Sequence, residues 1–123
     1  MKSSPQITLA QIAHARSGDK GNHANIAVIA YTPAGYDWLL ANLTAECVAD
    51  YFAHLEPSRV MRYEAPNLLA LNFVLYDVLA GGASRSLRID TQGKTLALAL
   101  LAMPIGSPDN LLDMQRPRVR NES

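Results

Sequence analysis

The segment His14-Ala-Arg-Ser-Gly-Asp-Lys-Gly-Asn-His-Ala-Asn25 is a polar stretch between two apolar runs, residues 7–13 and 26–31. It contains Gly18 and Gly21, and nearly every other side chain carries a donor, an acceptor or a charge. Glycine tolerates positive φ and lets backbone N–H groups turn toward one point. The composition predicts a loop between strands that receives a small polar or anionic group; the alternative is a long hairpin loop with solvated charges.

Both apolar runs are expected to be strands. Residues 6–15 are apolar enough for a strand, with Ile7 and Leu9 on one face and Ala10 and Ile12 on the other. Residues 25–31 are enriched in β-branched side chains and are apolar on both faces, as in a strand that is covered on two sides. The two strands are compatible with a hairpin around the polar segment, although the sequence leaves their pairing open.

A helical region is expected after the second strand. Thr32 and Pro33 have the pattern of a helix N-cap and first turn. From residue 36 to residue 55 the apolar side chains recur at helical spacing. Thr44 is a second candidate N-cap, so the pattern predicts one bent helix or two short helices that end near Pro57.

The next two elements are expected to be a strand and a buried helix. Residues 59–64 are polar on one side and predict a short strand. The run 68–80 is apolar almost all round and predicts a deeply buried helix that ends at Gly81 and Gly82. Asn72 interrupts this run, and a buried amide costs roughly 1–3 kcal/mol if it stays unpaired. We expect Asn72 either to bond to a neighbouring loop or to help position the polar segment.

Two further strands and a tail are predicted for the last part of the chain. Residues 84–90 alternate as a strand, and Arg85 on its core side needs an anion nearby, either Asp19 or a bound ligand. For residues 95–103 we favour a strand over a helix, because a turn precedes the leucine–alanine alternation and a proline follows it. Residues 104–123 are rich in proline and arginine and predict a loosely attached tail. The predicted core contains Ile26, Val28, Leu39, Leu43, Val48, Phe52, Phe73 and Leu87.

Length and charge favour a single cytoplasmic domain. The 123 residues suit one domain, 1–123, with an ordered core from about residue 6 to residue 103. The formal net charge of zero argues against a nucleic-acid partner and leaves little repulsion against a homo-oligomer, for which a dimer is the default. No run reaches the roughly 18 apolar residues that cross a bilayer, and the first six residues lack an apolar signal core. We therefore expect no membrane association.

Common cofactor, metal and catalytic motifs do not match this sequence. Lys20 precedes Gly21, whereas a P-loop lysine follows its glycine, and the dinucleotide fingerprint is absent. The three histidines match no zinc spacing, so neither a metal nor a cofactor is expected. Ser17, His14 and Asp19 form a Ser-His-Asp set without a nucleophile elbow. The lone cysteine at position 47 lies on an apolar stripe and is more typical of a core residue than of a nucleophile.

Several motifs occur in an order that is typical of one known family. They are His14-Ala-Arg-Ser-Gly-Asp-Lys-Gly21, Ala24-Asn-Ile-Ala-Val-Ile-Ala30, Tyr51-Phe-Ala53, Leu71-Asn-Phe-Val74, Gly81-Gly-Ala-Ser-Arg-Ser-Leu87 and Gln92-Gly-Lys94. From about Leu9 to Met103 the chain resembles the AtuA-like family, which is named for acyclic terpene utilisation. The resemblance implies a ferredoxin-like fold, and the element pattern suits an α+β two-layer sandwich with a mostly antiparallel sheet and helices on one face.

The resemblance also implies partners. In that family the module often forms the C-terminal part of a longer protein, and it also occurs as a separate small chain, which this one resembles. The genes often accompany acyl-CoA carboxylases and enoyl-CoA hydratases. The term ferredoxin-like describes shape only, because one cysteine cannot supply the four thiolates that usually hold an iron–sulfur cluster. The resemblance supplies no catalytic residues.

Two functions suit these residues. We favour an accessory or co-catalytic subunit that binds a larger AtuA-like protein and completes a site for an anionic metabolite, such as acyl-CoA or a carboxylate, in acyclic terpene or fatty and branched acid catabolism. The alternative is a self-contained hydratase, lyase or isomerase with Asp19 or His14 as general base, and with Lys20 and Arg85 stabilising a developing anion. The predicted ligand-binding residues are Arg16, Ser17, Gly18, Asp19, Lys20, Gly21, Asn25, Asn72, Arg85 and Ser86.

Overall fold

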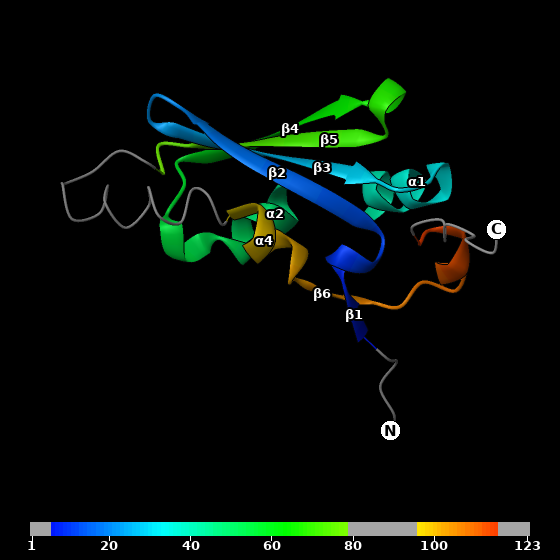
Figure 1. Ribbon diagram of the computed structural model, residues 1–123. Helices are drawn as coiled ribbons and strands as arrows, with labels where there is room; N and C mark the ends of the chain where they lie inside the picture. The colour runs from blue at the N-terminus through cyan, green and yellow to red at the C-terminus, as the bar shows by residue number, and fades with distance from the viewer. Residues whose placement is uncertain (1–5, 79–95, 116–123) are drawn as a thin grey trace.

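A four-stranded antiparallel sheet is the main element of the computed structural model, which describes residues 6–78 and 96–115. Two hairpins lie side by side in this sheet (Figure 1). The strand order is β2-β3-β5-β4, so β3 and β5 are the inner strands. The strands are β2 (Ala13–Lys20), β3 (His23–Ala30), β4 (Arg59–Ala65) and β5 (Ala70–Tyr76).

The described helices cover one face of this sheet (Figure 1). They are α1 (Pro33–Asn42) and α2 (Ala45–Tyr51), which pack on β3, β4 and β5, and α4 (Leu96–Leu101), which packs on β2 and β3. This arrangement confirms the predicted α+β fold with helices on one face of an antiparallel sheet. None of the described helices has the length and apolar character needed to cross a membrane. A second, two-stranded sheet pairs β1 (Gln6–Thr8) with β6 (Pro104–Gly106), and single 3₁₀ turns span Leu9–Gln11, Ala53–Leu55, Pro66–Leu68 and Leu111–Asp113.

The two helices after β3 begin at the predicted caps. Oγ1 of Thr32 accepts a hydrogen bond from the backbone N–H of Gly35 at 3.0 Å, and Pro33 lies in the first turn. Oγ1 of Thr44 accepts from the N–H of Cys47, also at 3.0 Å. Each side chain pairs an N–H group that has no partner within the helix. The region is therefore two short helices, which is one of the two predicted alternatives.

Arg62 connects β4 to the end of α1. Its Nη1 donates to the carbonyl oxygens of Leu40 at 3.1 Å and Leu43 at 3.0 Å, and its Nη2 lies 3.3 Å from Oε2 of Glu64. The last carbonyl groups of a helix lack partners within the helix and attract positive charge. A cation on the helix-covered side of the sheet is therefore paired within the fold.

The polar segment 14–25 is a hairpin and not a long loop, which corrects the prediction. The β2–β3 ladder begins at the pair Ala13–Ala30 and continues through the segment to the pair Lys20–His23. A two-residue turn, Gly21 and Asn22, then joins the strands. Gly21 has φ +63°, as a type II′ turn requires at its first position. The polarity of the segment misled the prediction because β2 is an edge strand with one solvated face, and Asp19 on its other side is also exposed.

The run 68–80 contains a central strand, where a buried helix was predicted. β5 occupies positions 70–76 and pairs with β3 on one side and β4 on the other. Leu71, Phe73 and Leu75 are buried, whereas Asn72, Val74 and Tyr76 are partly exposed. An apolar run of this length does not distinguish a buried strand from a buried helix, and here pairing on both edges decides.

The run 95–103 shows the opposite error. Leu96–Leu101 form helix α4, where a strand was favoured, and the burial of Leu96, Ala97 and Leu100 has helical spacing. Leucine and alanine are among the strongest helix formers, so the alternation of two apolar residues did not indicate a strand. The predicted strand 84–90 and the end of the predicted helix lie outside the described residues.

Residues 104–115 of the predicted tail are attached more firmly than expected. β6 pairs with β1, and Met114 is 4% exposed. Oγ1 of Thr32 also donates to the carbonyl oxygen of Asp113 at 2.7 Å, and Nε2 of Gln115 donates to Oε1 of Gln11 at 3.3 Å. Residues 104–115 are therefore part of the packed structure.

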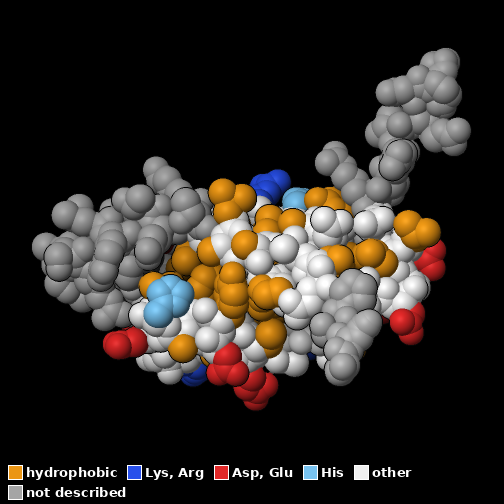
Figure 2. Space-filling model, turned by 90° about the horizontal axis from the view of Figure 1, so that it is seen from below, with side chains coloured by type: hydrophobic (Ala, Val, Ile, Leu, Met, Phe, Trp, Pro, Cys, Tyr) orange, Lys and Arg blue, Asp and Glu red, His pale blue; other side chains and the backbone are white. Residues whose placement is uncertain are grey.

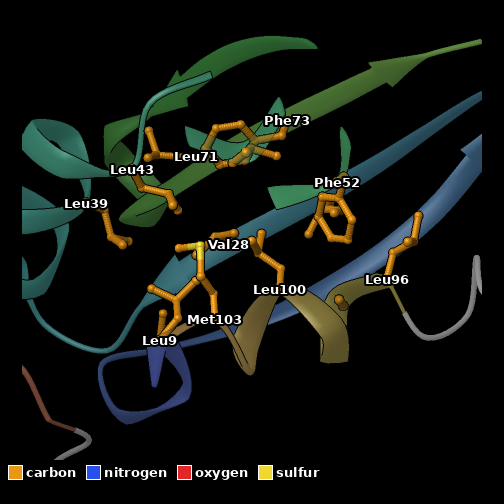
Figure 3. Close-up of a cluster of buried hydrophobic side chains, with 14 of the residues drawn as sticks. Leu9, Val28, Leu39, Leu43, Phe52, Leu71, Phe73, Leu96, Leu100 and Met103 are labelled. Carbon is orange, nitrogen blue, oxygen red and sulfur yellow. The ribbon is translucent and has the colours of Figure 1, made fainter. Parts of the chain in front are cut away.

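The apolar core lies between the large sheet and the helices (Figure 3). Leu87 lies outside the described residues. The other predicted members are all buried in one cluster: Ile26, Val28, Leu39, Leu43, Val48, Phe52 and Phe73.

We expect Phe73→Ala to lower the free energy of unfolding by about 3–5 kcal/mol, because it opens a cavity beneath the central strand. Urea denaturation measures the change. Leu112→Ala is the matched control, since Leu112 is 84% exposed and its truncation should change stability by about 0.5 kcal/mol or less. Equal losses in the two variants would contradict this account of the core.

Candidate functional site

The strand register divides the large sheet into two faces. Directly opposed residues of an antiparallel pair point to the same side, and successive residues alternate. The pairs Ile26–Phe73 and Val28–Leu71 are buried against the helices, so the positions between them lie on the opposite face, which we call the outer face. The outer-face positions are His14, Arg16, Gly18 and Lys20 in β2, His23, Asn25, Ala27 and Ile29 in β3, Ala70, Asn72, Val74 and Tyr76 in β5, and Arg59, Met61, Tyr63 and Ala65 in β4.

The predicted single pocket is divided by the sheet. Ser17 and Asp19 oppose the buried residues Ile26 and Ala24 and therefore lie on the helix-covered side. Oγ of Ser17 accepts from the N–H of Ala97 at 3.4 Å, near the start of α4, where backbone N–H groups need partners. Asn25 and Asn72 lie on the outer face, so the described residues do not form the pocket as predicted. Arg85 and Ser86 lie outside the described residues.

The two glycines of the polar segment have separate places. Gly18 belongs to the β2–β3 ladder and opposes Asn25, whereas Gly21 lies in the hairpin turn. Gly18 therefore does not bend the segment as predicted, and only Gly21 lies at a turn. Arg16 is exposed on the outer face opposite Ala27, and Lys20 occupies the register position opposite His23.

Asn25 and Asn72 are brought together across β3 and β5. Nδ2 of Asn25 donates to Oδ1 of Asn72 at 3.4 Å. A Cβ atom at Gly18 would lie 3.3 Å from Oδ1 of Asn25, so the absence of a side chain at position 18 leaves room for this amide. The partner of Asn72 is thus a residue of the polar segment, which is one of the two arrangements expected.

A second cluster lies on the outer face at the end of the sheet where the β2–β3 turn is found. The sequence did not reveal this cluster. The Arg59 guanidinium carbon lies 4.4 Å from the Tyr76 ring centroid, as in a cation–π contact. The hydroxyl oxygens of Tyr63 and Tyr76 are 3.5 Å apart. The ring of His23 lies 4.7 Å from that of Tyr76. We call these four residues the aromatic–cationic cluster.

His23 is oriented by the residue that follows β5. Its Nδ1 accepts the backbone N–H of Asp77 at 3.0 Å and lies 3.8 Å from Oδ1 of Asp77. Asp77 has φ +65°, and its Oδ2 accepts a hydrogen bond from Oγ of Ser58. Since Nδ1 is an acceptor, neutral His23 carries its proton on Nε2.

The two tyrosines of the cluster have pKa values that are shifted in opposite directions. The hydrogen bond with Tyr63, followed by interactions with Arg59, lowers the pKa of Tyr76 below its usual value. The same hydrogen bond and the proximity of Tyr76 raise the pKa of Tyr63. Tyr63 therefore holds its proton while Tyr76 is the first of the pair to ionise.

Cys47 has the environment of a packing residue. It is partly buried against the core, and burial, followed by the Asp50 carboxylate, raises the pKa of its thiol. A raised pKa lowers the thiolate fraction at neutral pH, and the thiolate is the nucleophile.

The outer face is suited to binding negative charge. None of its positions carries an aspartate or a glutamate. Within residues 6–78 and 96–115, neither Arg16 nor Arg59 has a carboxylate oxygen within 4.0 Å. A guanidinium without a carboxylate partner is the side chain best suited to a planar anion.

We expect Tyr63→Phe to raise the pKa of Tyr76, because the variant removes the hydroxyl whose hydrogen bond with Tyr76 lowers that pKa. Ultraviolet difference titration or NMR of the tyrosine rings measures the pKa. Tyr31→Phe is the control, since Tyr31 stacks on His14, with ring centroids 5.4 Å apart, away from the cluster. A Tyr76 pKa that is equal in the Tyr63→Phe and wild-type proteins would contradict the hydrogen-bond assignment.

Comparison with known proteins identifies one family. The model of the AtuA ferredoxin-like domain matches residues 7–106, which is most of the 123-residue chain. Searches of curated proteins and of solved structures found no significant match. The family assignment therefore stands on the same span that carries the ordered motifs and the β2–β3–β5–β4 sheet. The chain belongs to the AtuA ferredoxin-like family.

Proposed function

We propose that this chain is a cytoplasmic accessory or co-catalytic subunit of a larger AtuA-like protein, and that its outer face completes a binding site for an anionic metabolite. The observation that carries the proposal is the charge of that face, where Arg16 and Arg59 lie without a carboxylate at any outer-face position. An unpaired guanidinium binds carboxylate and phosphate oxygens with charge-assisted hydrogen bonds.

An acyl-CoA or another carboxylate-bearing molecule has the combination of groups that this face accommodates. Met61 is 37% exposed, and Ile29 and Val74 are partly exposed on the same face as the two arginines. Apolar side chains beside cations suit a ligand with a carbon chain and a negative head group. We place this ligand in the catabolism of acyclic terpenes or of fatty and branched acids, the context that the family name suggests.

A self-contained enzyme that uses Asp19 as its base is disfavoured, because Asp19 and the outer-face arginines lie on opposite sides of the sheet. Asp19 lies on the helix-covered side of β2, whereas His14 lies on the outer face and stacks on Tyr31. A general base must lie within hydrogen-bond reach of the proton that it removes. Asp19 therefore does not face the outer-face arginines that would stabilise an anion.

The helix-covered side of the molecule supports the proposed association with another subunit. Figure 2 shows this side of the molecule, where hydrophobic side chains gather toward the centre. Leu98 of α4 is 65% exposed, and Leu101 is partly exposed. Exposed apolar residues on one side favour association with another subunit, and we propose a homodimer when the larger partner is absent.

We expect Arg16→Gln to weaken the binding of octanoyl-CoA roughly threefold, as calorimetry would measure, because the variant removes one exposed charge-assisted contact. Ala41→Glu is the matched control. It lowers the net charge by the same amount on the exposed side of α1, so it should leave the affinity unchanged. Equal weakening in both variants would indicate a general charge effect and would count against an outer-face site.

The accessory role has its own test. A tagged copy of the chain, purified from its native host, should retain a larger AtuA-like protein that mass spectrometry identifies. Turnover of acyl-CoA thioesters by the purified chain alone would overturn the accessory role in favour of the self-contained enzyme.

A further inference from the structure

The aromatic–cationic cluster brings several hydrogen-bond donors to one end of the outer face. From its residues we propose an oxyanion site, in which Arg59, Tyr76, Tyr63 and His23 bind the carboxylate or phosphate head group of a ligand that also carries an alkyl chain. This inference rests on the proposed function, because it specifies where on the outer face the anion binds.

Arg59 supplies the charge of the oxyanion site. Its guanidinium lies against the face of the Tyr76 ring, which holds the guanidinium in place and leaves its N–H groups at its edge. Within residues 6–78 and 96–115 no carboxylate is paired with Arg59. Arg62, three residues along the same strand, donates to two backbone carbonyl groups of the helical layer and is not available to a ligand.

The tyrosine pair supplies at least one further donor. A contact between two hydroxyl groups uses one proton, so the other proton is free to point toward a ligand whichever tyrosine donates. The pair lies next to the Arg59 guanidinium, so this proton and the guanidinium N–H groups are at the same end of the outer face.

His23 supplies a third donor, which the backbone orients. Its Nδ1 is occupied as the acceptor of the Asp77 N–H, so the neutral ring donates through Nε2 at its other edge. The carboxylate of Asp77 accepts a hydrogen bond from Ser58 and lies on the Nδ1 side of the ring, with Oδ1 3.8 Å from Nδ1. The carboxylate therefore does not stand between Nε2 and a ligand.

Apolar surface borders these donors. Tyr63 is 47% exposed and Met61 is 37% exposed, and both follow Arg59 along β4 on the same face. A head group bound at Arg59 would place a short alkyl chain along these side chains, whereas a free inorganic anion would leave them uncovered. The oxyanion site therefore favours a ligand with an anionic head and an alkyl chain over a free anion.

An NMR titration of backbone amides tests the oxyanion site with three probes: octanoate, octan-1-ol and inorganic phosphate. We expect octanoate to shift the amides of His23, Arg59 and Tyr76, phosphate to shift the same amides with weaker affinity, and octan-1-ol to leave them unchanged.

Arg59→Gln should weaken octanoate binding about tenfold, because Arg59 supplies the charge-assisted contact. Tyr76→Phe should weaken it less, and Ala41→Glu should have no effect. The amide spectrum of each variant verifies that it is folded, and Arg59 is exposed, so its replacement leaves the core intact.

The outcomes separate this inference from the proposed function. If octanoate shifts the amides near Arg16, Asn25 and Asn72, and Arg59→Gln retains the wild-type affinity, the oxyanion site is overturned while anion binding by the outer face stands. If octan-1-ol and octanoate bind equally well, the oxyanion site is also overturned, because recognition would not depend on charge. If neither octanoate nor phosphate shifts any outer-face amide, the oxyanion site and the proposed ligand binding both fail.

Discussion

The antiparallel pairing of β3 with β5 determines which side chains lie on each face of the large sheet. Its register places Ile26 opposite Phe73 and Val28 opposite Leu71, so these side chains enter the core together. The same register leaves Asn25 and Asn72 on the outer face, close enough for their amides to bond. A shift of one residue would exchange the two faces and expose the apolar set, which is why burial on one side specifies the register so strongly.

The two arginines of β4 show how this constraint separates structural from functional roles. Arg62 lies on the helix-covered side, where carbonyl oxygens at the end of α1 accept its hydrogen bonds. Arg59 has the opposite parity and lies over the Tyr76 ring on the outer face. The side chains are chemically identical, but only the second lies on the face that offers positive charge without a carboxylate at its register positions. The face of the strand on which each arginine lies, and not the residue type, therefore decides its role. Arg62 stabilises the fold, and Arg59 belongs to the candidate site.

The sequence determined those features that depend on interactions between near neighbours. Thr32 and Thr44 cap helices because each side chain bonds to an N–H group only three residues away. The alternation in β3 indicated a strand, and the core residues of β3, α1 and α2 followed from burial of the apolar positions. The ordered motifs also identified the family. Each of these inferences required only local spacing or the identity of side chains.

Tertiary structure alone decided the elements and sites that depend on distant partners. The apolar run around Phe73 is a strand because β3 and β4 supply hydrogen-bond partners on both sides, and no local signal reports such partners. Once β5 is a strand, Tyr76 meets Arg59, Tyr63 and His23, which come from two other strands. Ser17 and Asn25 were expected in one pocket because they are near in sequence, yet the alternation of side chains places them on opposite faces. Sequence proximity sets local structure, whereas the pairing of distant strands sets which side chains share a face.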